Sequence, residues 1–534
     1  MSPNTRELHE RLAEIVGPDH VDTDPARMAR LFPSTYPQSH LPLGFVRPAS
    51  AEDVAAIVKA AGDLGASLYP ISRGRNWGYG DACPTSGGQV VMDLGRMNRI
   101  LHIDEDLAYA VIEPGVTQGQ LADALTERGA GLWFDSTGAG PEASIVGNVM
   151  ERGFGHTAYG DRVRTVSGME VVMADGARLR TGFGDVKGSA VGAVYPYGVG
   201  PYLDGMFTQS SFGIVTEMTI WLMPEPTHFA AAICQVKRHE DIFELIERLR
   251  PLRLDETLRS IVHIGNDLRL ISGRMRYPYE RAGGHTPLPE GLRRSLSEEL
   301  DVTPWSFSAA LYGDAGQVGA AKAKLKKALR GLDCRLIFLD DRKLAIARTL
   351  AGTLSFLPAG RALKEKLEQA EPSVGLLKGR PSEAFLPGAY WRSRTPLPVG
   401  RPLNPAEDGC GMIWIGPVLP ATARDLERLL DIAEPVFRAH GFDFLLTLSF
   451  VTARSLSAVM TITYDREDEG ERDKARACHR EVAEMTARAG YPAYRGHSQA
   501  MDLSSADNGA FRDTVTRIKN ALDPERIIAP GRYD

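Results

Sequence analysis

The sequence predicts an α+β fold divided into two domains. At 534 residues the chain is long for a single hydrophobic core. Segments with apolar residues at helical spacing are mixed with short runs that favour strands, which is typical of α+β proteins. The character of the sequence changes near Pro224-Glu225-Pro226, and a second mixed region continues to about residue 490.

The N-terminal half mixes capped helices with short strands. Ser50 precedes residues 51–61, whose apolar spacing and early acidic residues predict a capped helix. Thr117 is expected to cap a second helix in the same way. Residues 104–112 are predicted to form one strand, and residues 169–181 a hairpin that turns at an Asp-Gly pair.

The second region contains two distinctive segments. Residues 320–330 form a basic amphipathic run, which we interpret as the solvated face of a helix and not as a site for membranes or polyanions. Residues 392–408 are rich in Pro and Arg and are predicted to form a long loop. Long ordered loops inside compact domains are often functional.

Composition excludes several classes of protein. Apolar residues make up 43% of the chain and the formal net charge is −6, so the chain can build packed cores and has no general attraction to nucleic acid. The start of the chain is charged where a signal peptide needs an apolar core, and no apolar run reaches the length of a membrane span. We therefore expect a cytoplasmic protein that does not bind membranes. The 5 cysteines lack a C-x-x-C pair, which argues against disulfides and against a metal site.

Residues 70–80, P-I-S-R-G-R-N-W-G-Y-G, are the most informative stretch. Glycines let several backbone N–H groups converge on one anion, and these glycines follow a strand-like run. The stretch lacks the lysine of a P-loop, and the segment after it favours a strand over the helix of a dinucleotide fingerprint. We expect this backbone to bind a cofactor phosphate.

Further glycine-bearing turns lie between short apolar strands, at residues 113–117, 135–140, 145–148, 151–157 and 212–216. The chain also contains the motifs V-x-E-P-G-V-T, G-N-x-x-x-R-G-x-G-x-T-x-Y-G and S-G-M-E-V-V-x-A-x-G, and a C-terminal I-I-A-P-G-R. With these motifs the sequence resembles the vanillyl-alcohol oxidase and p-cresol methylhydroxylase flavoproteins over nearly its whole length.

The resemblance implies bound FAD and a PCMH-type FAD-binding fold with an α+β cap domain over the flavin. In that family the N-terminal half and the C-terminal tail form the FAD domain, so we expect this domain at 1–224 plus 490–534 and the cap at 225–489. Arg532 matches a basic residue that would stabilise the reduced flavin. The residues that the resemblance places at the cofactor are Pro70, Ile71, Ser72, Arg73, Gly74, Arg75, Asn76, Trp77, Gly78, Pro114, Gly115, Ser136, Thr137, Gly138, Gly147, Asn148, Gly153, Gly155, His156, Gly213, Ile214, Val215, Tyr390 and Arg532.

The family's chemistry depends on a phenolate. A para-phenolate pushes negative charge through its ring, so that loss of hydride from the benzylic carbon leaves a neutral p-quinone methide. Holding the phenolate requires hydrogen-bond donors and a permanent cation. The family carries a Tyr-Tyr-Arg triad for this task, and the matching residues are Tyr79, Tyr494 and Arg495.

Several positions depart from the family. No aspartate falls at the position that assists the chemistry near flavin N5 in the oxidases, so Glu142 is a candidate general base, with a solvent-facing loop residue as the alternative. Ser457-Ala458 replaces two histidines of the cap. His156 stands where the family usually has tyrosine, and we favour core packing over a flavin contact. Glu383 matches a family carboxylate only if a gap is allowed, and its role stays open.

The mode of FAD attachment can be narrowed. A histidyl link at the family position is excluded, because no histidine lies between His285 and His440. Tyr390, in a Y-W-R sequence, resembles the tyrosine that carries FAD in the cresol hydroxylases, although the spacing differs. Non-covalent FAD with a buried, structural Tyr390 is favoured over a tyrosyl link.

These features predict an FAD-dependent enzyme that oxidises a para-substituted phenol of the 4-alkylphenol, vanillyl alcohol or eugenol type. Hydride would leave the benzylic or allylic carbon, with O₂ favoured as the electron acceptor. One alternative is a cytochrome-coupled hydroxylase or dehydrogenase, and another is an inactive flavin-binding or assembly protein. We expect a homodimer, and neither a metal nor a nucleic acid as a partner.

Overall fold

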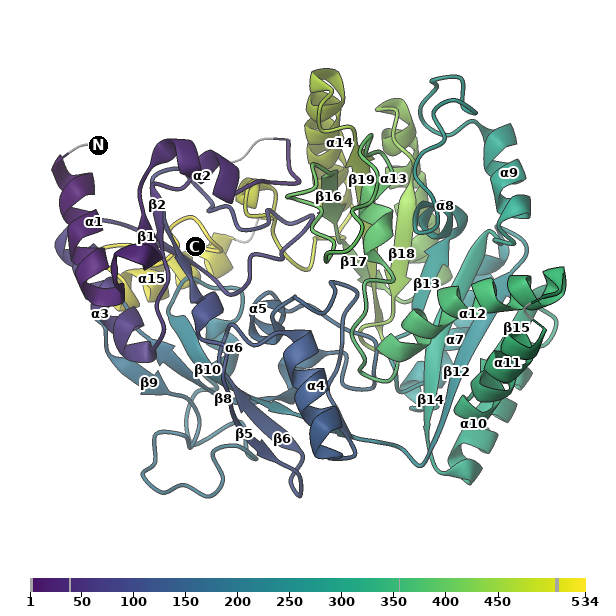
Figure 1. Cartoon of the computed structure of the whole chain (residues 1–534), viewed down its shortest axis with the longest axis horizontal. Helices are drawn as coiled ribbons and strands as arrows, with labels where there is room; N and C mark the ends of the chain where they lie inside the picture. Colours follow the sequence, from purple (N-terminus) through teal and green to yellow (C-terminus); the bar gives the residue numbers. More distant parts are fainter. Residues whose placement is uncertain (1–2, 38–39, 355, 505–508) are drawn as a thin grey trace.

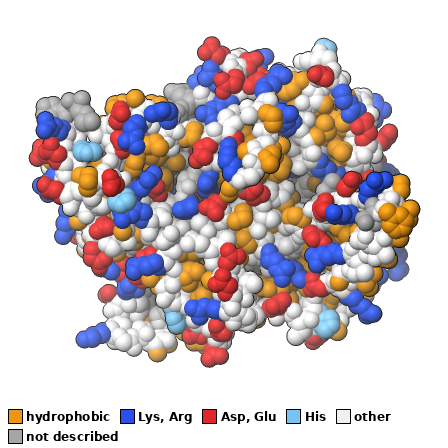
Figure 2. Space-filling model, in the orientation of Figure 1, with side chains coloured by type: hydrophobic (Ala, Val, Ile, Leu, Met, Phe, Trp, Pro, Cys, Tyr) orange, Lys and Arg blue, Asp and Glu red, His pale blue; other side chains and the backbone are white. Residues whose placement is uncertain are grey.

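The structure is a computed structural model that describes residues 3–37, 40–354, 356–504 and 509–534. The chain forms two parts that lie side by side, one built from the N-terminal half and the C-terminal tail and the other from the middle of the chain (Figure 1). The first part contains sheets of 4 and 5 strands, and the second is built on a sheet of 8 strands. On the face drawn in Figure 2, basic and acidic side chains are interspersed.

The four-stranded sheet carries the glycine-rich loop. Its strand order is β1-β2-β4-β3, with bounds β1 Val21–Asp22, β2 Gly44–Val46, β4 Val90–Asp93 and β3 Leu68–Ile71. The helices α1 (Pro3–Val16) and α3 (Ala51–Asp63) share a hydrophobic core with this sheet. Ser50 Oγ accepts the N–H of Asp53 at 3.1 Å, which confirms the predicted cap.

The five-stranded sheet is antiparallel. Its order is β5-β6-β10-β8-β9, with bounds β5 Ile100–Asp104, β6 Tyr109–Ile112, β10 Ile214–Trp221, β8 Val166–Val172 and β9 Arg178–Arg180. The β8–β9 hairpin and the Thr117 cap of α4 (Gln118–Arg128) are as predicted. The single strand predicted over 104–112 is wrong: a turn at 105–108 separates β5 from β6, and Ala108 has a φ of 54°.

The eight-stranded sheet separates a hydrophobic core from the first part of the molecule. Its order is β15-β12-β14-β13-β18-β19-β16, and β17 pairs with β19. Along β19, Leu456, Ala458, Met460 and Ile462 face the core formed with α7, α10, α13 and α14, so the alternating residues face the other way. The bounds are β12 His228–Val236, β13 His263–Asn266, β14 Trp305–Gly313, β15 Cys334–Leu339, β16 Gly411–Ile415, β17 Val418–Pro420, β18 Leu445–Ser449, β19 Ser455–Tyr464, α7 Asp241–Leu254, α10 Ala315–Ala328, α13 Ala423–Ala439 and α14 Glu469–Arg488.

The other helices and one further pair of strands complete the fold. They are α2 Pro25–Leu31, α5 Ile145–Met150, α6 Asp204–Phe207, α8 Asp267–Ser272, α9 Glu290–Glu299, α11 Asp341–Thr353, α12 Pro358–Leu376, α15 Gly509–Leu522 and the pair β7 Leu132–Trp133 and β11 Met223–Pro224. Residues 392–408 form a long segment without regular structure, as predicted. No described helix combines the length and the apolar composition that a membrane crossing requires.

The C-terminal tail returns to the four-stranded sheet. The N–H of Leu68 donates to the carbonyl of Ile527, and the N–H of Ala529 donates to the carbonyl of Leu68, each at 2.7 Å. The tail therefore pairs with β3 in parallel at the edge of the sheet. The buried Lys519 Nζ donates to the carbonyls of Ser211 and Ile528 and to Asp523, each at 2.7 Å. The tail is therefore fixed beside the glycine-rich loop.

A buried carboxylate joins the two parts of the molecule. Asp81, which ends the glycine-rich loop, accepts the backbone N–H of Thr35 at 2.6 Å and the hydroxyls of Thr35 and Ser34. The carbonyl of Thr35 then accepts from the N–H of Met412 at 2.9 Å and from the hydroxyl of Tyr464 at 2.6 Å, both in the eight-stranded sheet. The loop and the sheet are thus held in register.

We predict that the protein loses stability as the pH falls from about 6.5 to about 4. Tyr36, His479 and His497 form a buried cluster with ring centroids 4.3–5.7 Å apart. Burial lowers the pKa of His479 to about 4 and also lowers the pKa of His497, so the unfolded chain takes up protons before the folded one does. Asp81 acts in the opposite direction between about pH 4 and 6, because burial raises its pKa to about 6.

The melting temperature measured from pH 7.5 to 4.5 tests this prediction, with His479→Gln as the variant. The histidines outnumber Asp81, so we expect the wild type to melt at lower temperature in acid and the variant to show a shallower dependence. Equal slopes for the two proteins would contradict the assignment.

Candidate functional site

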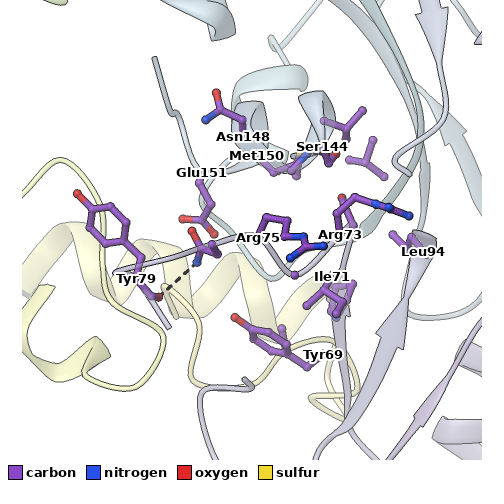
Figure 3. A pocket seen from close by; sticks show the side chains of 18 of the residues that line it. Tyr69, Ile71, Arg73, Arg75, Tyr79, Leu94, Ser144, Asn148, Met150 and Glu151 are labelled. Atoms are coloured by element: carbon purple, nitrogen blue, oxygen red, sulfur yellow. Dashed lines mark hydrogen bonds between the residues drawn. The ribbon is translucent and has the colours of Figure 1, made fainter. Parts of the chain in front are cut away.

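A cavity lies between the glycine-rich loop, α5, the start of β10 and the C-terminal tail (Figure 3). Many residues predicted to bind the cofactor line it: Pro70, Ile71, Ser72, Arg73, Gly74, Arg75, Asn76, Trp77, Gly147, Asn148, Gly213, Ile214, Val215 and Arg532. Sequence reasoning missed others, among them Tyr69, Leu94, Ser144, Glu151, Ser210 and Trp414. The structure therefore brings the separate glycine-bearing turns together around one space.

The loop end of this cavity carries unpaired hydrogen-bond donors. Arg75 Nη1 and Ser210 Oγ are buried and have no hydrogen-bond partner among the described residues. Burial lowers the pKa of the Arg75 guanidinium, which indicates a cation that has lost its water. A diphosphate would supply both charge and acceptors to these groups, so the residues present fit FAD.

The predicted triad is assembled. Tyr79 Oη lies 3.4 Å from Tyr494 Oη, and Arg495 Cζ lies 4.0 Å from the centroid of the Tyr79 ring. Asn76 Nδ2 donates to the backbone carbonyl of Tyr79 at 3.3 Å and so helps to fix the position of Tyr79 (Figure 3). Burial raises the pKa of Tyr79 more than Arg495 lowers it, so its hydroxyl stays protonated and can donate a hydrogen bond.

Glu151 is the main charged residue that the sequence analysis missed. This buried carboxylate forms ion pairs with Arg532 and, at 3.5 Å, with Arg495, and accepts the hydroxyl of Tyr533 at 2.8 Å. One carboxylate between two guanidiniums leaves a net positive charge beside the triad. The only sequence signal is that Glu151 occupies an unspecified position inside the G-N-x-x-x-R-G motif.

The remaining predicted cofactor residues support the cavity without lining it. Ser136 Oγ donates to the carbonyl of Leu376 at 3.1 Å, the N–H of Thr137 donates to Gln118 Oε1 at 2.7 Å, and the carbonyl of Pro114 accepts from Ser144 Oγ at 2.7 Å. The full set outside the lining is Gly78, Pro114, Gly115, Ser136, Thr137, Gly138, Gly153, Gly155, His156 and Tyr390.

The two side chains with predicted chemical roles that lie away from the triad have other partners. Glu142 is half-exposed and pairs with Arg73 at 3.1 Å, so it neutralises a residue of the loop. Tyr390 is fully buried, and its hydroxyl donates to Asp408. Burial and this bond both raise the pKa of Tyr390. Glu383 accepts the N–H of Leu403 at 3.0 Å and thereby fixes the long loop.

The eight-stranded sheet forms the wall beyond the triad. Trp414 lines the cavity and contacts Tyr79 edge to face at 5.6 Å. From Tyr494 a row of rings runs along this wall through Phe154, His263 and His156 to Phe385, with successive centroids 4.3–6.2 Å apart. His156 packs in this row, between His263 and Phe385.

The histidines of the row are neutral. His263 Nε2 donates to the carbonyl of Gly155 at 3.1 Å, which leaves Nδ1 to accept from Ser449 Oγ at 2.9 Å. Burial lowers the pKa of His263 to about 4 and lowers that of His156. Ser457, paired across strands with Ser449, has a buried hydroxyl without a partner among the described residues. The described chain contains no cluster of three His, Cys, Asp or Glu side chains that could hold a metal ion.

We predict that Gly416→Ala separates the two tyrosines. A Cβ at this position would lie 2.7 Å from Tyr494 Cε1 and 3.1 Å from Tyr79 Oη, so one ring has to move. A displacement of this kind should break the hydrogen bond between the two hydroxyls. Crystal structures of Gly416→Ala and of the control Gly319→Ala test this, since a Cβ at Gly319 meets nothing within 4 Å. An unchanged distance between Tyr79 Oη and Tyr494 Oη in Gly416→Ala would contradict the role of this contact.

Comparison with known proteins gives three kinds of similarity. Residues 42–182 match the model of an FAD binding domain. The chain is 38% identical to 1'-carboxy-chondrochloren decarboxylase of Chondromyces crocatus, over 99% of this chain and 98% of that protein. It is 32% identical to the flavoprotein subunit of 4-cresol dehydrogenase [hydroxylating] of Pseudomonas putida, over 92% of this chain and 88% of that subunit.

Two solved structures share the whole fold. Substrate-bound p-cresol methylhydroxylase superposes with a TM-score of 0.88 at 28% identity, covering 100% of this chain and 97% of the other. The isoeugenol complex of 4-ethylphenol oxidase from Gulosibacter chungangensis superposes with a TM-score of 0.87 at 29% identity, with the same coverage.

Proposed function

The chain belongs to the p-cresol methylhydroxylase and vanillyl-alcohol oxidase family of FAD-dependent enzymes. We propose that it oxidises a para-substituted phenol at the benzylic or allylic carbon of the para substituent. The observation that carries this proposal is the contact of Tyr79, Tyr494 and Arg495 at one end of the cavity. Two hydroxyl donors and a permanent cation form a site for a phenolate oxygen. The chain has the two-domain α+β fold of this family, with sheets of four and five strands in one part and the eight-stranded sheet in the other.

The tyrosines and the arginine of the triad have different tasks. Tyr79 and Tyr494 hydrogen-bond the substrate oxygen, and Arg495 stabilises its negative charge, which favours ionisation of the phenol. Bound FAD supplies a hydride acceptor with two-electron capacity. As hydride leaves, positive charge develops on the benzylic carbon. The phenolate neutralises this charge through the ring, so the substrate becomes a p-quinone methide. Water addition then gives an alcohol, and proton loss gives an alkene.

The cofactor is proposed to be held by the loop at 70–77, Gly147, Asn148, residues 213–215 and the tail. Arg75 and Ser210 would satisfy their unpaired donors on its phosphates. We propose an FAD domain of residues 1–224 and 490–534 and a cap of residues 225–489, in keeping with the pairing of Leu68 and Ile528. A homodimer and the use of O₂ remain part of the proposal, the latter supported by the oxidase among the similar structures.

A second candidate is oxidative decarboxylation. It is favoured by the 38% identity to a decarboxylase along the whole chain. A quinone methide with a carboxylate on the carbon next to the benzylic one can lose CO₂. The electron pair of the broken C–C bond forms the alkene and returns the ring to phenolate, so no oxidant beyond FAD is required.

We predict that Tyr79→Phe and Tyr494→Phe each slow substrate oxidation by about 10²–10³-fold, because each removes one donor to the phenolate. Anaerobic mixing of the holoenzyme with 4-ethylphenol, followed by the loss of flavin absorbance, measures this step. Tyr277→Phe is the control, since its hydroxyl bonds the carbonyl of His285 far from the triad.

The same experiment separates the alternatives. Recovery of the flavin absorbance in air at a turnover-competent rate supports an oxidase, and recovery only with an added cytochrome or dye supports a dehydrogenase. No loss of absorbance with any of a broad set of phenols would favour an inactive flavin-binding protein.

We also predict that FAD is bound without a covalent link. The hydroxyl of Tyr390 is protonated and directed at Asp408, so it is a poor nucleophile toward the flavin. Acid precipitation of the holoenzyme should leave the yellow colour in the supernatant, and Tyr390→Phe should retain its FAD. A yellow, fluorescent polypeptide band on a denaturing gel would contradict this.

A further inference from the structure

Arg269 is a half-buried cation without an ion-pair partner among the described residues. It lies in α8, and its guanidinium makes one long hydrogen bond, from Nη2 to the carbonyl of Phe385 at 3.4 Å. Among the described residues no carboxylate forms an ion pair with it, whereas the neighbouring Arg293 pairs with Asp267 at 2.7 Å. Burial alone lowers the pKa of Arg269, to about 10, so the group is still charged at neutral pH.

The position of Arg269 relates it to the proposed phenol site. Gly265 of β13 pairs with Thr447 and faces the same side of the sheet as His263, two residues earlier. The side chains of Arg269 and Leu270 lie over Gly265, at ordinary contact distance from where a Cβ there would be. Gly388 leaves space for the guanidinium, since a Cβ at Gly388 would overlap Arg269 Nη1.

Arg269 stands at the end of the row of rings that starts at the triad. Its Cζ lies 6.0 Å from the centroid of Phe385, which stacks on His156 with centroids 5.6 Å apart and an interplanar angle of 6°. The row continues through His263 and Phe154 to Tyr494. Both histidines are neutral, so the charge of Arg269 is not opposed by a second cation in the row.

A partly desolvated cation that has no ion-pair partner among the described residues can bind an anion. The planar fork of an arginine matches a carboxylate through two parallel hydrogen bonds.

We propose that Arg269 binds a carboxylate carried by the para side chain of the substrate, so that the substrate class is the 4-hydroxyphenyl alkanoic acids. This inference rests on the proposed phenol oxidation. Arg269 would then determine specificity, and the substrate's carboxylate is the group that a decarboxylating reaction would need.

Binding and turnover of matched acid and neutral phenols test the proposal. The probes are 4-hydroxyphenylacetate, 3-(4-hydroxyphenyl)propionate and 4-(4-hydroxyphenyl)butyrate, with 4-propylphenol as the uncharged match. Dissociation constants are measured by anaerobic titration calorimetry on the holoenzyme. For at least one acid we expect Arg269→Met to weaken binding by about 10- to 100-fold, the loss of a charge-assisted hydrogen bond, with little change for 4-propylphenol.

Thermal stability without ligand distinguishes a binding residue from a structural one. Arg269→Met removes a half-buried charge that has no ion-pair partner among the described residues, so its melting temperature should equal or exceed that of the wild type. Arg293→Met breaks the pair with Asp267, so it should melt at lower temperature and still bind the acids. A lower melting temperature for Arg269→Met with unchanged acid binding would overturn the proposal.

The outcomes separate this inference from the proposed function. If 4-propylphenol is bound and oxidised while every acid is rejected by the wild type, the role of Arg269 is wrong and phenol oxidation stands. If no phenol, acid or neutral, binds or reduces the flavin, the proposed function fails and this inference fails with it.

Discussion

The buried contact between Asp81 and Thr35 is the constraint on which the site depends. Asp81 has a φ of 57° and closes the glycine-rich loop, so the backbone on either side of Tyr79 has a fixed course. Thr35 connects that loop to β16 and β19 through its carbonyl. One hydrogen-bonded segment therefore positions the glycine-rich loop, the first tyrosine of the triad and the wall that carries Trp414. A cofactor and a substrate bound on opposite sides of this segment would be held in a defined relative position.

The electrostatics of the cavity favour anions at both ends. Arg75 Nη1 has no hydrogen-bond partner among the described residues, and Arg495 shares Glu151 with Arg532 near the triad. Glu151 reduces the charge that the triad would otherwise carry and holds the two guanidiniums in place. A phenol would ionise there because the surplus charge is positive, while burial keeps Tyr79 protonated as a donor by raising its pKa.

Local sequence patterns predicted the parts of the fold that local physics decides. The caps at Ser50 and Thr117 and the hairpin of β8 and β9 follow from neighbouring residues, and the triad followed from a family resemblance. The turn inside 104–112 was missed because Ala108 adopts a left-handed backbone without a glycine signal. Glu151 was missed because its ion-pair partner Arg495 lies far away along the chain. Arg269 was missed because the sequence does not show that its guanidinium has no ion-pair partner among the described residues. Glu142 was assigned a possible chemical role because the sequence could not show that Arg73 would occupy it.

The return of the C-terminal tail has a consequence for folding. Ile528, Ala529 and Arg532 line the cavity, and Ile527 and Ala529 pair with the edge of the sheet that carries the glycine-rich loop. The cavity is therefore enclosed by segments that lie more than 400 residues apart. Such long-range pairing costs loop-closure entropy before its contacts form, so the walls of the cavity are expected to close late in folding.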